Sequence, residues 1–418
     1  MLIKPMIRNN ICINSHPAGC AQSVRNQIAR AVKDLAGGTS PQEAAKAVPG
    51  TPKLALIIGC STGYGLASRI CAAFGYGAAT VGVSFEKPAS ASKPGTPGFY
   101  NNLTFDAEAA RAALPFITLD GDAFSGEMKE RAIAAVRDMA KAAGIPAEID
   151  LIIYSLASPV RTDPRDGTVY RSVIKPIGQP YSGKTIDMMS GAIITVSAEP
   201  ASPEEIAHTI KVMGGEDWEL WIDALDKAGL LAAGARTLAY TYIGPELSWA
   251  IYKNGTIGRA KEDLERAARA INRRFSEKAS GGGAWVSVNK ALVTRASAVI
   301  PIIPFYVSTL FKVMKERGLH EGCIEQIVRL YRDRLYAPGA AVDPALVPVD
   351  GEGRIRVDDR EMREDVQRAV LEQMDKVSGE NVDSATDIAG FRHDFLEAHG
   401  FDVAGVDYGR DVDPLIIV

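Results

Sequence analysis

A continuous apolar run that ends in a glycine-rich turn constrains the fold of this chain more than any other feature of its 418 residues. The run is Leu54 to Ile58, and Gly59-Cys60-Ser61-Thr62-Gly63-Tyr64-Gly65 follows it directly. A short apolar strand without alternation is typical of a parallel sheet that is covered on both faces. Glycines let the turn after such a strand bring its backbone close to a phosphate at the N-terminus of the next helix. A plain strand-to-helix connection has the same local pattern, so the rest of the chain must support the dinucleotide interpretation.

The segments that follow the turn alternate between strand-like and helix-like patterns. We expect strands at residues 79–85, 116–119, 151–156, 237–243 and 285–288. We expect helices at residues 66–74, 204–212, 218–228 and 260–275, and a long helix with Ile133, Val136 and Met139 on one side that runs to Gly144. This order predicts an α/β fold: a Rossmann-type, doubly wound, mostly parallel sheet with helices on both faces.

Two regions interrupt the alternation. Residues 1–17 predict a small hairpin that turns at Arg8-Asn9-Asn10, followed by a helix capped by Ser23 and then by a loop up to Leu54. Residues 158–203 hold the turn signals Asp166-Gly167 and Ser190-Gly191, which predict inserted hairpins. The expected organisation is an N-terminal hairpin and helix (1–50), a dinucleotide-binding part (51–157), an inserted part that covers the substrate (158–235), a continuation of the Rossmann part (236–300) and a helical C-terminal part on the substrate side (301–418).

The charge balance excludes nucleic acid as an expected partner. Lysine and arginine number 47 against 51 acidic residues, which gives a formal net charge of −4, and no block of five like charges occurs. Binding to a phosphate backbone requires concentrated positive charge. The five cysteines are sparse and no secretory or transit segment precedes them, so we expect a cytoplasmic protein.

One apolar run, Ala298 to Val307, invites a membrane interpretation. It is shorter than the ~20 residues that a spanning helix needs. Pro301 and Pro304 also remove backbone donors that lipid cannot replace. We expect no membrane insertion, and the run is either a pocket wall or a core segment.

The histidines and cysteines do not form a recognisable metal site. Cys12, His16 and Cys20 lie close in sequence, but their spacing fits no common structural zinc set, so no metal is expected. His320 and Cys323 lack the motif of an acyl-transfer nucleophile. The other histidines, His208, His393 and His399, occur in polar contexts and are expected to be solvated.

Three more strand ends are expected to line the same cleft as the glycine-rich turn. Ligands of open α/β sheets bind outside the carboxyl ends of the strands. The ends in question are Phe85-Glu86, Asp122-Ala123 and Leu156-Ala157. The carboxylate of Glu86 could accept hydrogen bonds from an adenosine ribose and repel a 2′-phosphate, which favours NADH over NADPH, although Lys87 and Lys93 oppose that preference. Asp122 could equally be a carboxylate at a helix N-terminus.

Tyr252 and Lys261 are candidates for reacting groups. On one unbroken helix, residues nine positions apart point to opposite faces. We therefore expect a break at Asn254-Gly255 and a new helix from Thr256, which would let both side chains turn into one cleft. A nearby ammonium would lower the pKa of the phenol and strengthen its hydrogen bond to an enolate. A half-buried tyrosine and a solvated lysine would give the same spacing.

A set of long motifs decides between these interpretations. Seven motifs occur along the chain in a fixed order. They are GCSTGYG, Phe85-Glu86, GDAF at 121–124, YSLASP at 154–159, VMGGEDW at 212–218, Tyr252 and Lys261 with eight residues between them, and HEGCIEQ at 320–326. Over nearly the whole chain the sequence resembles the single-chain trans-2-enoyl-CoA reductase family, which includes the FabV-type enoyl-acyl-carrier-protein reductases. It is most similar to the bacterial enoyl-CoA branch.

The resemblance implies a role for each matching residue. Tyr252 matches the catalytic proton donor, Lys261 the cofactor-binding lysine and Tyr242 the tyrosine next to the substrate thioester. The positions that match NADH contacts are Gly59, Cys60, Ser61, Thr62, Gly63, Tyr64, Phe85, Glu86, Asp122, Ala123, Leu156, Ala157, Lys261, Leu292, Val293 and Thr294. The implied reaction adds hydride from NADH to C3 of a trans-2-enoyl thioester such as crotonyl-CoA, while tyrosine hydrogen-bonds the thioester oxygen and C2 is protonated.

Other functions remain open at this point. The acyl group could be carried by CoA, in fatty acid synthesis or butyrate-type metabolism, or by an acyl carrier protein, which a basic patch near the pocket would favour. A dinucleotide-binding sensor without turnover is a non-enzyme alternative. The resemblance also implies a monomer.

Overall fold

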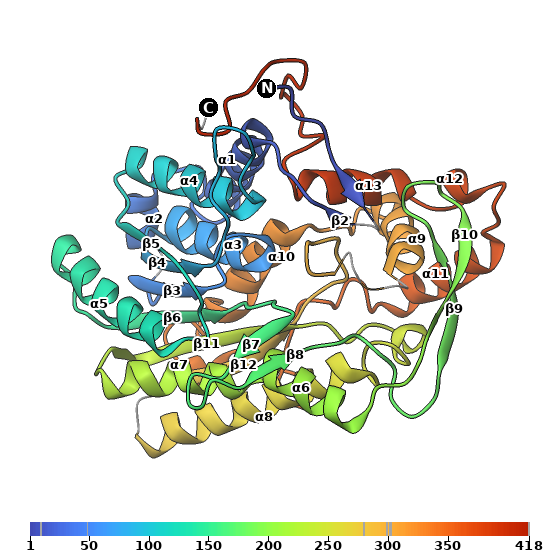
Figure 1. Cartoon of the computed structure of the whole chain (residues 1–418). Coiled ribbons are helices and arrows are strands. Elements are labelled where there is room, and N and C mark those ends of the chain that lie inside the picture. The colour runs from blue at the N-terminus through green and yellow to red at the C-terminus, as the bar shows by residue number, and fades with distance from the viewer. Residues whose placement is uncertain (9–10, 48, 279–280, 298–299, 301–302, 417–418) are drawn as a thin grey trace.

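The centre of the molecule is one sheet of seven parallel strands (Figure 1). The structure, a computed structural model, describes residues 1–8, 11–47, 49–278, 281–297, 300 and 303–416. The strand order is β13-β12-β11-β6-β3-β4-β5, and every neighbouring pair is parallel. The strands are β3 (Leu54–Ile58), β4 (Ala79–Ser84), β5 (Phe116–Asp120), β6 (Ile149–Tyr154), β11 (Leu231–Thr241), β12 (Gly283–Val288) and β13 (Ile355–Arg356). The order reverses between β3 and β6, which is where a doubly wound sheet binds its ligand.

The side chains of β3 explain why the sheet is covered on both faces. All five residues are fully buried. Successive side chains of a strand point to opposite faces. Ala55 and Ile57 accordingly belong to one hydrophobic cluster, and Leu54, Leu56 and Ile58 to another. The prediction of a Rossmann-type sheet with helices on both faces is confirmed.

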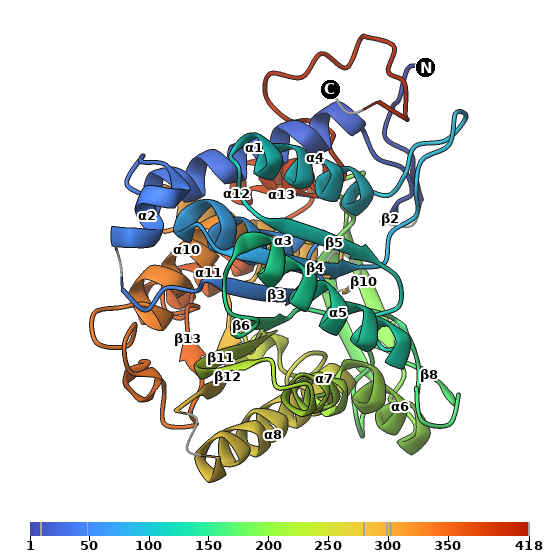
Figure 2. The ribbon, with the colours of Figure 1, turned by 90° about the vertical axis from the view of Figure 1, so that its left-hand side faces the viewer.

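Helices from different parts of the chain cover the two faces (Figure 2). The first face packs against α1 (Pro17–Asp34), α3 (Gly63–Ile70) with the π-helical turn η1 (Cys71–Gly75), α4 (Pro97–Arg111) and α10 (Cys323–Leu330) with η3 (Tyr331–Leu335). The second face packs against α5 (Gly126–Ala143), α7 (Glu216–Lys227) and α8 (Thr256–Glu277), with α6 (Pro203–Met213) beside α8.

A third hydrophobic cluster lies at the carboxyl ends of the strands, on the side of the C-terminal helices (Figure 1). It includes residues of α9 (Ile303–Glu316), α11 (Glu364–Lys376), α12 (Val382–Ala385) and α13 (Ile388–Glu397). The hairpin of β9 (Tyr181–Ile186) and β10 (Ile193–Ala198) packs on α9, and the smaller hairpin of β7 (Val160–Thr162) and β8 (Val169–Arg171) packs on α6. Both hairpins turn at the predicted Asp166-Gly167 and Ser190-Gly191 positions.

The N-terminal region differs from its predicted form. A hairpin of β1 (Ile7–Arg8) and β2 (Ile11–Cys12) is present, while Asn9 and Asn10 of its turn lie outside the described residues. The capping role predicted for Ser23 is wrong: α1 begins earlier, and the His16 side chain accepts the capping hydrogen bond from the Gly19 amide at 3.3 Å. Pro17 suits the first helical position because its missing amide needs no partner there.

Two helices were not predicted. The short helix α2 (Pro41–Ala47) lies in the expected loop, and Ser40 and Glu43 cap it reciprocally, a sequence signal that precedes many helices. The helix α4 connects β4 and β5 as parallel strands require. The remaining short turns are η2 (Glu246–Ser248) and η4 (Pro344–Leu346).

The apolar run at 298–307 forms part of the core where it is described. Residues 298–299 and 301–302 lie outside the described part of the chain, whereas Phe305 and Val307 are buried in α9. Within the described residues, no helix combines the length and apolarity that a membrane span requires.

Candidate active site

The glycine-rich turn lies at the point where the strand order reverses. Gly59 has a φ of +89°, and a Cβ at this position would lie 2.2 Å from the carbonyl oxygen of Ser155, which follows β6. A Cβ at Gly65 would lie 1.9 Å from the carbonyl oxygen of Gly59. Only glycine allows the turn to pack this closely. The turn leads into α3, whose N-cap Thr62 makes no side-chain capping bond, so the first amides of the helix remain available to an anion.

Glu86 connects the turn to the neighbouring loops. Its Oε1 accepts a 2.6 Å hydrogen bond from the Ser61 hydroxyl and lies 3.5 Å from Nη1 of Arg295. Its amide donates to Oδ1 of Asp120 at 2.8 Å. Phe85 beside it is 76% exposed. The acid therefore lies at the tip of β4, between the glycine-rich turn and the loop that follows β12, where a ribose-binding carboxylate is expected.

The other predicted cofactor contacts lie in three loops. Thr294 lies opposite the turn, because a Cβ at Gly63 would be 3.9 Å from its Cγ2, and Leu292 and Val293 are buried beside it. Asp122 is engaged locally: its Oδ1 accepts the Phe124 amide at 2.9 Å in the turn before α5. The remaining contacts, Leu156 and Ala157, follow β6, and Ala157 is exposed.

A buried ion pair holds the loop that contains Ala123. The Lys129 ammonium donates to Oδ1 of Asp217 at 2.8 Å and to the carbonyl oxygens of Ala123 and Phe124 at 3.2 and 3.1 Å. Tyr154 donates to the other carboxylate oxygen of Asp217 at 3.2 Å. The pair links α5, α7 and the end of β6 beneath the predicted cofactor loop.

The predicted break between Tyr252 and Lys261 is confirmed. The N-cap of α8 is Gly255, where a Cβ would lie 2.3 Å from the carbonyl oxygen of Ile251, and Thr256 is the first helical residue. Tyr252 lies in the irregular turn before the helix. Nζ of Lys261, one turn into α8, donates to the carbonyl oxygen of Tyr240 at 3.1 Å, near the end of β11.

Two tyrosines lie together at this end of the sheet. The rings of Tyr242 and Tyr252 meet edge to face with centroids 5.0 Å apart. Tyr242 follows β11, so both phenols and the Lys261 ammonium gather around the carboxyl end of one strand. Tyr64 of the glycine-rich turn donates to the carbonyl oxygen of Lys290, which connects the turn to the loop after β12. The residues predicted to react and the predicted cofactor turn thus lie at the same end of the sheet, where the carboxyl ends of the strands meet.

The predicted effect of the ammonium on the phenol is wrong in this structure. Burial raises the pKa of Tyr252, which is 7% exposed, and burial lowers the pKa of Lys261 to about 8. The reason is that the Lys261 ammonium donates to a backbone carbonyl, and desolvation dominates both groups. The phenol therefore keeps its proton at neutral pH and is a hydrogen-bond donor.

Several polar residues near the site were not predicted. Glu361 is fully buried and accepts hydrogen bonds from Tyr242 and Tyr306, and Lys290 is buried nearby. Glu361 stands in the sequence DDREMRED, a run of charge that is typical of a solvated loop, so no local signal distinguishes it. Arg295 carries no motif of its own either.

The solvation predicted for one histidine is wrong. His399 is 6% exposed and its ring lies 5.4 Å from that of Phe395, so burial lowers its pKa to about 4. The backbone carbonyl of His399 accepts a hydrogen bond from the amide of His16. His399 therefore lies where the C-terminal segment contacts the start of α1.

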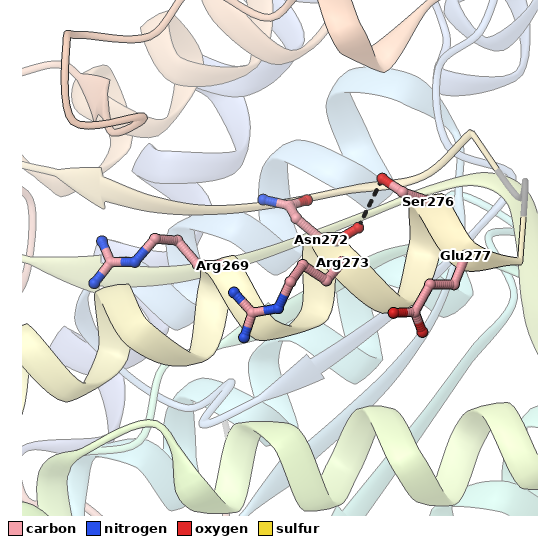
Figure 3. A pocket seen from close by; sticks show the side chains of 5 residues that line it. All are labelled: Arg269, Asn272, Arg273, Ser276 and Glu277. Carbon is pink, nitrogen blue, oxygen red and sulfur yellow. Dashed lines mark hydrogen bonds between the residues drawn. The ribbon is translucent and has the colours of Figure 1, made fainter.

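A shallow depression on α8 lies away from these groups (Figure 3). It is lined by Arg269, Asn272, Arg273, Ser276 and Glu277, and the Ser276 hydroxyl donates to the Asn272 carbonyl oxygen at 3.0 Å. Arg273 is twelve residues from Lys261, about 18 Å along the helix. The depression is therefore separate from the group formed by Tyr242, Tyr252 and Lys261.

Comparison with known proteins gives one consistent family. Residues 93–336 match the family model of the trans-2-enoyl-CoA reductase catalytic region, residues 2–91 the NAD(P)H binding domain of trans-2-enoyl-CoA reductase, and residues 349–412 an enoyl reductase FAD binding domain. The chain is 56% identical over 413 residues to the trans-2-enoyl-CoA reductase (NADH) of Treponema denticola, with 99% of each chain covered. It is 51% identical to the enoyl-acyl-carrier-protein reductase (NADH) of Cytophaga hutchinsonii, over 100% of this chain and 99% of the other. The crystal structure of the Treponema denticola enzyme in complex with NAD matches with a TM-score of 0.91, over 99% of this chain and 98% of the other.

The segment matched by the flavin-named model does not resemble the glycine-rich turn. Its strand β13 is followed by Val357-Asp358-Asp359-Arg360-Glu361, in which three of five residues are acidic. Asp358 and Glu361 are both buried. Asp358 is already paired with Arg356, and Glu361 accepts hydrogen bonds from Tyr242, Tyr306 and the Ala291 amide. Residues 357–365 contain no glycine that would let backbone amides approach a pyrophosphate, so this segment does not fit a flavin dinucleotide and we assign no chemistry to one.

Proposed function

The chain belongs to the trans-2-enoyl-CoA reductase family, and from this premise we propose that it reduces the C2–C3 double bond of a trans-2-enoyl-CoA such as crotonyl-CoA, with NADH as reductant. The product is the saturated acyl-CoA. The observation that carries the proposal is the grouping of Tyr242, Tyr252 and Lys261 at the carboxyl end of β11, on the same edge of the sheet as the glycine-rich turn.

The chain offers a separate set of groups for each part of NADH. The amides at the start of α3 suit the pyrophosphate, and Glu86 suits the adenosine ribose. Phe85 offers an exposed ring beside Glu86. We assign Thr294, which lies opposite Gly63, to the part of the cofactor beside the turn, and Lys261 to the nicotinamide half. When bound, NADH supplies the hydride that adds to C3 of the substrate.

Tyr252 has the properties of a donor to the thioester oxygen. Its raised pKa keeps the hydroxyl protonated, and its burial strengthens a hydrogen bond to an oxygen on which negative charge develops. Lys261, with a pKa near 8, is mostly cationic at pH 7 and adds a positive charge beside the same oxygen. Tyr242 lies against Tyr252 and is placed to contact the same thioester.

A spectrophotometric assay tests the proposal. The full chain is mixed with NADH and crotonyl-CoA, and the loss of NADH absorbance is followed together with the formation of butyryl-CoA. We expect turnover with this pair of substrates. Binding of NADH without turnover would instead favour a dinucleotide-binding sensor and contradict the proposal.

A carrier-protein substrate is the second candidate, because relatives such as the Cytophaga hutchinsonii protein carry that name at 51% identity. The acyl chain and the thioester are the same in both cases. Comparing kcat/KM for crotonyl-CoA and crotonyl-acyl carrier protein separates them, and a higher value for the carrier would replace CoA in the proposal. We further propose that the chain acts as a cytoplasmic monomer, which sedimentation of the purified protein tests in part.

A further inference from the structure

A buried carboxyl group lies directly behind Tyr242. Glu361, from the loop between β13 and α11, is fully buried. Its Oε1 accepts the hydroxyls of Tyr242 at 2.9 Å and Tyr306 at 2.7 Å, and its Oε2 accepts the amide of Ala291 at 2.7 Å. Residues from three distant parts of the chain therefore converge on one carboxyl group.

The direction of these hydrogen bonds depends on whether Glu361 carries a proton. An ionised carboxylate only accepts, and a phenol has a single proton to donate. While Tyr242 gives its proton to an ionised Glu361, it has none left for a substrate. Its hydroxyl is then unable to stabilise an oxyanion.

A protonated Glu361 has one natural acceptor for its own proton. Oε2 is occupied by the Ala291 amide, so the proton belongs on Oε1. The Tyr306 oxygen already accepts from Nε2 of Gln367 at 3.2 Å while its hydroxyl donates to Oε1. The carboxyl proton is therefore directed to the oxygen of Tyr242. Tyr242 also lies within hydrogen-bond reach of the Tyr306 hydroxyl, whose oxygen already accepts from Gln367, so the Tyr242 proton that no longer goes to Oε1 is available to a substrate oxygen.

We propose that Glu361 is a positioning residue that holds a proton and so turns the Tyr242 hydroxyl into a hydrogen-bond donor toward the substrate thioester oxygen. This inference rests on the function proposed above. With Glu361 protonated, Tyr242 and Tyr252 both donate to the developing enolate oxygen, which needs more than one donor for strong stabilisation. Glu361 itself forms and breaks no bond with the substrate.

The surroundings of Glu361 favour the neutral form, with one opposing charge. Burial raises the pKa of Glu361, whereas nearby Lys290 and the three hydrogen bonds act in the other direction. Burial also lowers the pKa of Lys290 to about 8, and its ammonium donates to the Ala291 carbonyl oxygen at 2.8 Å.

The other groups that face Glu361 are uncharged at neutral pH. They are Tyr242 after β11, Tyr306 of α9, Gln367 of α11 and Tyr64 of α3, and the pKa of each of the three tyrosines is raised by burial. Lys290 is thus the charged group that opposes protonation of Glu361 most directly.

Infrared difference spectroscopy determines whether Glu361 is protonated, without any assay of activity. Spectra of the full-length protein and of Glu361→Gln are recorded at pH 7 and subtracted. We expect the carbonyl stretch of a protonated carboxyl group in the wild type and its absence from the variant. A difference that contains only carboxylate bands would overturn the proposal.

A double-mutant cycle tests whether Glu361 acts through Tyr242. We expect Glu361→Ala to lower kcat by at least about tenfold with Tyr242 in place and by less than about threefold in the Tyr242→Phe background. The KM for NADH is measured in each variant, because Glu361 also accepts the amide of Ala291 next to the predicted cofactor contact Leu292. It should stay within about threefold in Glu361→Gln, whose side-chain oxygen can still accept that amide. Equal losses in the two backgrounds would indicate a structural role and overturn the proposal.

The glutamine variant supplies a rescue. Glu361→Gln keeps a neutral donor at this position. Its kcat should therefore be at least about tenfold higher than that of Glu361→Ala. A glutamine variant as slow as the alanine variant, with normal NADH binding, would contradict the inference. A wild-type chain that leaves NADH unchanged with crotonyl-CoA would overturn the proposed function instead, and the infrared spectra would still decide the state of Glu361.

Discussion

The hydroxyl of Ser61 donates a 2.6 Å hydrogen bond to Oε1 of Glu86, and this contact joins the turn after β3 to the tip of β4. Arg295 approaches the same oxygen to 3.5 Å from the loop after β12. The carboxylate is therefore held in place from two sides before any ribose arrives. An acid fixed at this position accepts ribose hydroxyls and repels a 2′-phosphate.

Replacing Glu86 by glutamine should weaken the preference for NADH. The amide keeps the size of the side chain but removes the negative charge, and Arg295 is then free to attract a phosphate. We expect the ratio of kcat/KM for NADPH to that for NADH to rise by about tenfold or more, since close charge pairs contribute more than ~1 kcal/mol. Steady-state kinetics with both cofactors measures the ratio. If it stays constant, Glu86 does not discriminate between them.

Replacing Tyr252 by phenylalanine should slow the reaction without weakening cofactor binding. Loss of one donor to a developing oxyanion costs about 10²–10³ in kcat. The KM for NADH should change by less than about threefold, because the removed hydroxyl faces the thioester. Kinetics with crotonyl-CoA gives both constants.

Tyr336→Phe is a matched control for this experiment. Tyr336 is also buried, but its hydroxyl has no hydrogen-bond partner among the described residues, so its removal should leave kcat unchanged. Normal activity in Tyr252→Phe would rule out a donor role for that hydroxyl.

The pH dependence of cofactor use should follow Lys261. Burial lowers the pKa of its ammonium to about 8, so the group is charged below that pH and neutral above it. We expect kcat/KM for NADH to be level below pH 8 and to fall by about tenfold per pH unit above it. In Lys261→Arg the overall rate is lower, but the fall should move to higher pH because a guanidinium stays charged. An arginine variant with the same alkaline fall would assign the titration to another group.

The pattern of the chain predicted those parts of the structure that local chemistry determines. The apolar run of β3 and the glycines that follow it fix both a buried parallel strand and a close turn. The break at Gly255 was predictable because Tyr252 and Lys261 could not share one helix face. The helix α2 had a signal in the Ser40–Glu43 pair, which needs no tertiary information.

Residues that act through distant partners could not be found in this way. Glu361 meets Tyr242 across 119 positions of sequence, and its charged neighbours make it look solvated. The burial of His399 likewise depends on packing against Phe395 and on a contact with α1. The error about the Tyr252 pKa has the same origin, because desolvation is a property of the folded environment and not of the spacing.

Two glycines of the same turn should respond differently to alanine. At Gly65 the new Cβ would lie 1.9 Å from the carbonyl oxygen of Gly59, so α3 must move away from the turn after β3, and we expect a large loss of stability, about 3 kcal/mol or more. At Gly63 the nearest atom would be 3.9 Å away, and the φ of +55° costs only about 1–2 kcal/mol. Its methyl group would occupy the approach of the pyrophosphate, so Gly63→Ala should mainly raise the KM for NADH. Urea unfolding and NADH titration separate the two effects, and equal unfolding free energies would refute the steric argument.

Removing one partner of the Lys129–Asp217 ion pair should destabilise the protein more than removing both. Lys129→Met leaves the Asp217 carboxylate buried with the Tyr154 hydroxyl still donating to it, and removing one partner of a buried pair typically costs about 3–5 kcal/mol. Burial already raises the pKa of Asp217, so its ionised form opposes folding. The variant should therefore recover stability as the pH falls through the folded-state pKa of Asp217, where the acid becomes neutral.

Adding Asp217→Asn to Lys129→Met removes the unpaired charge and should restore part of the lost free energy of unfolding at pH 8. Urea unfolding of Lys129→Met, Asp217→Asn and the double variant at pH 8 and pH 5 tests this, and a double variant whose loss equals the sum of the two single losses would show that the two groups are not coupled.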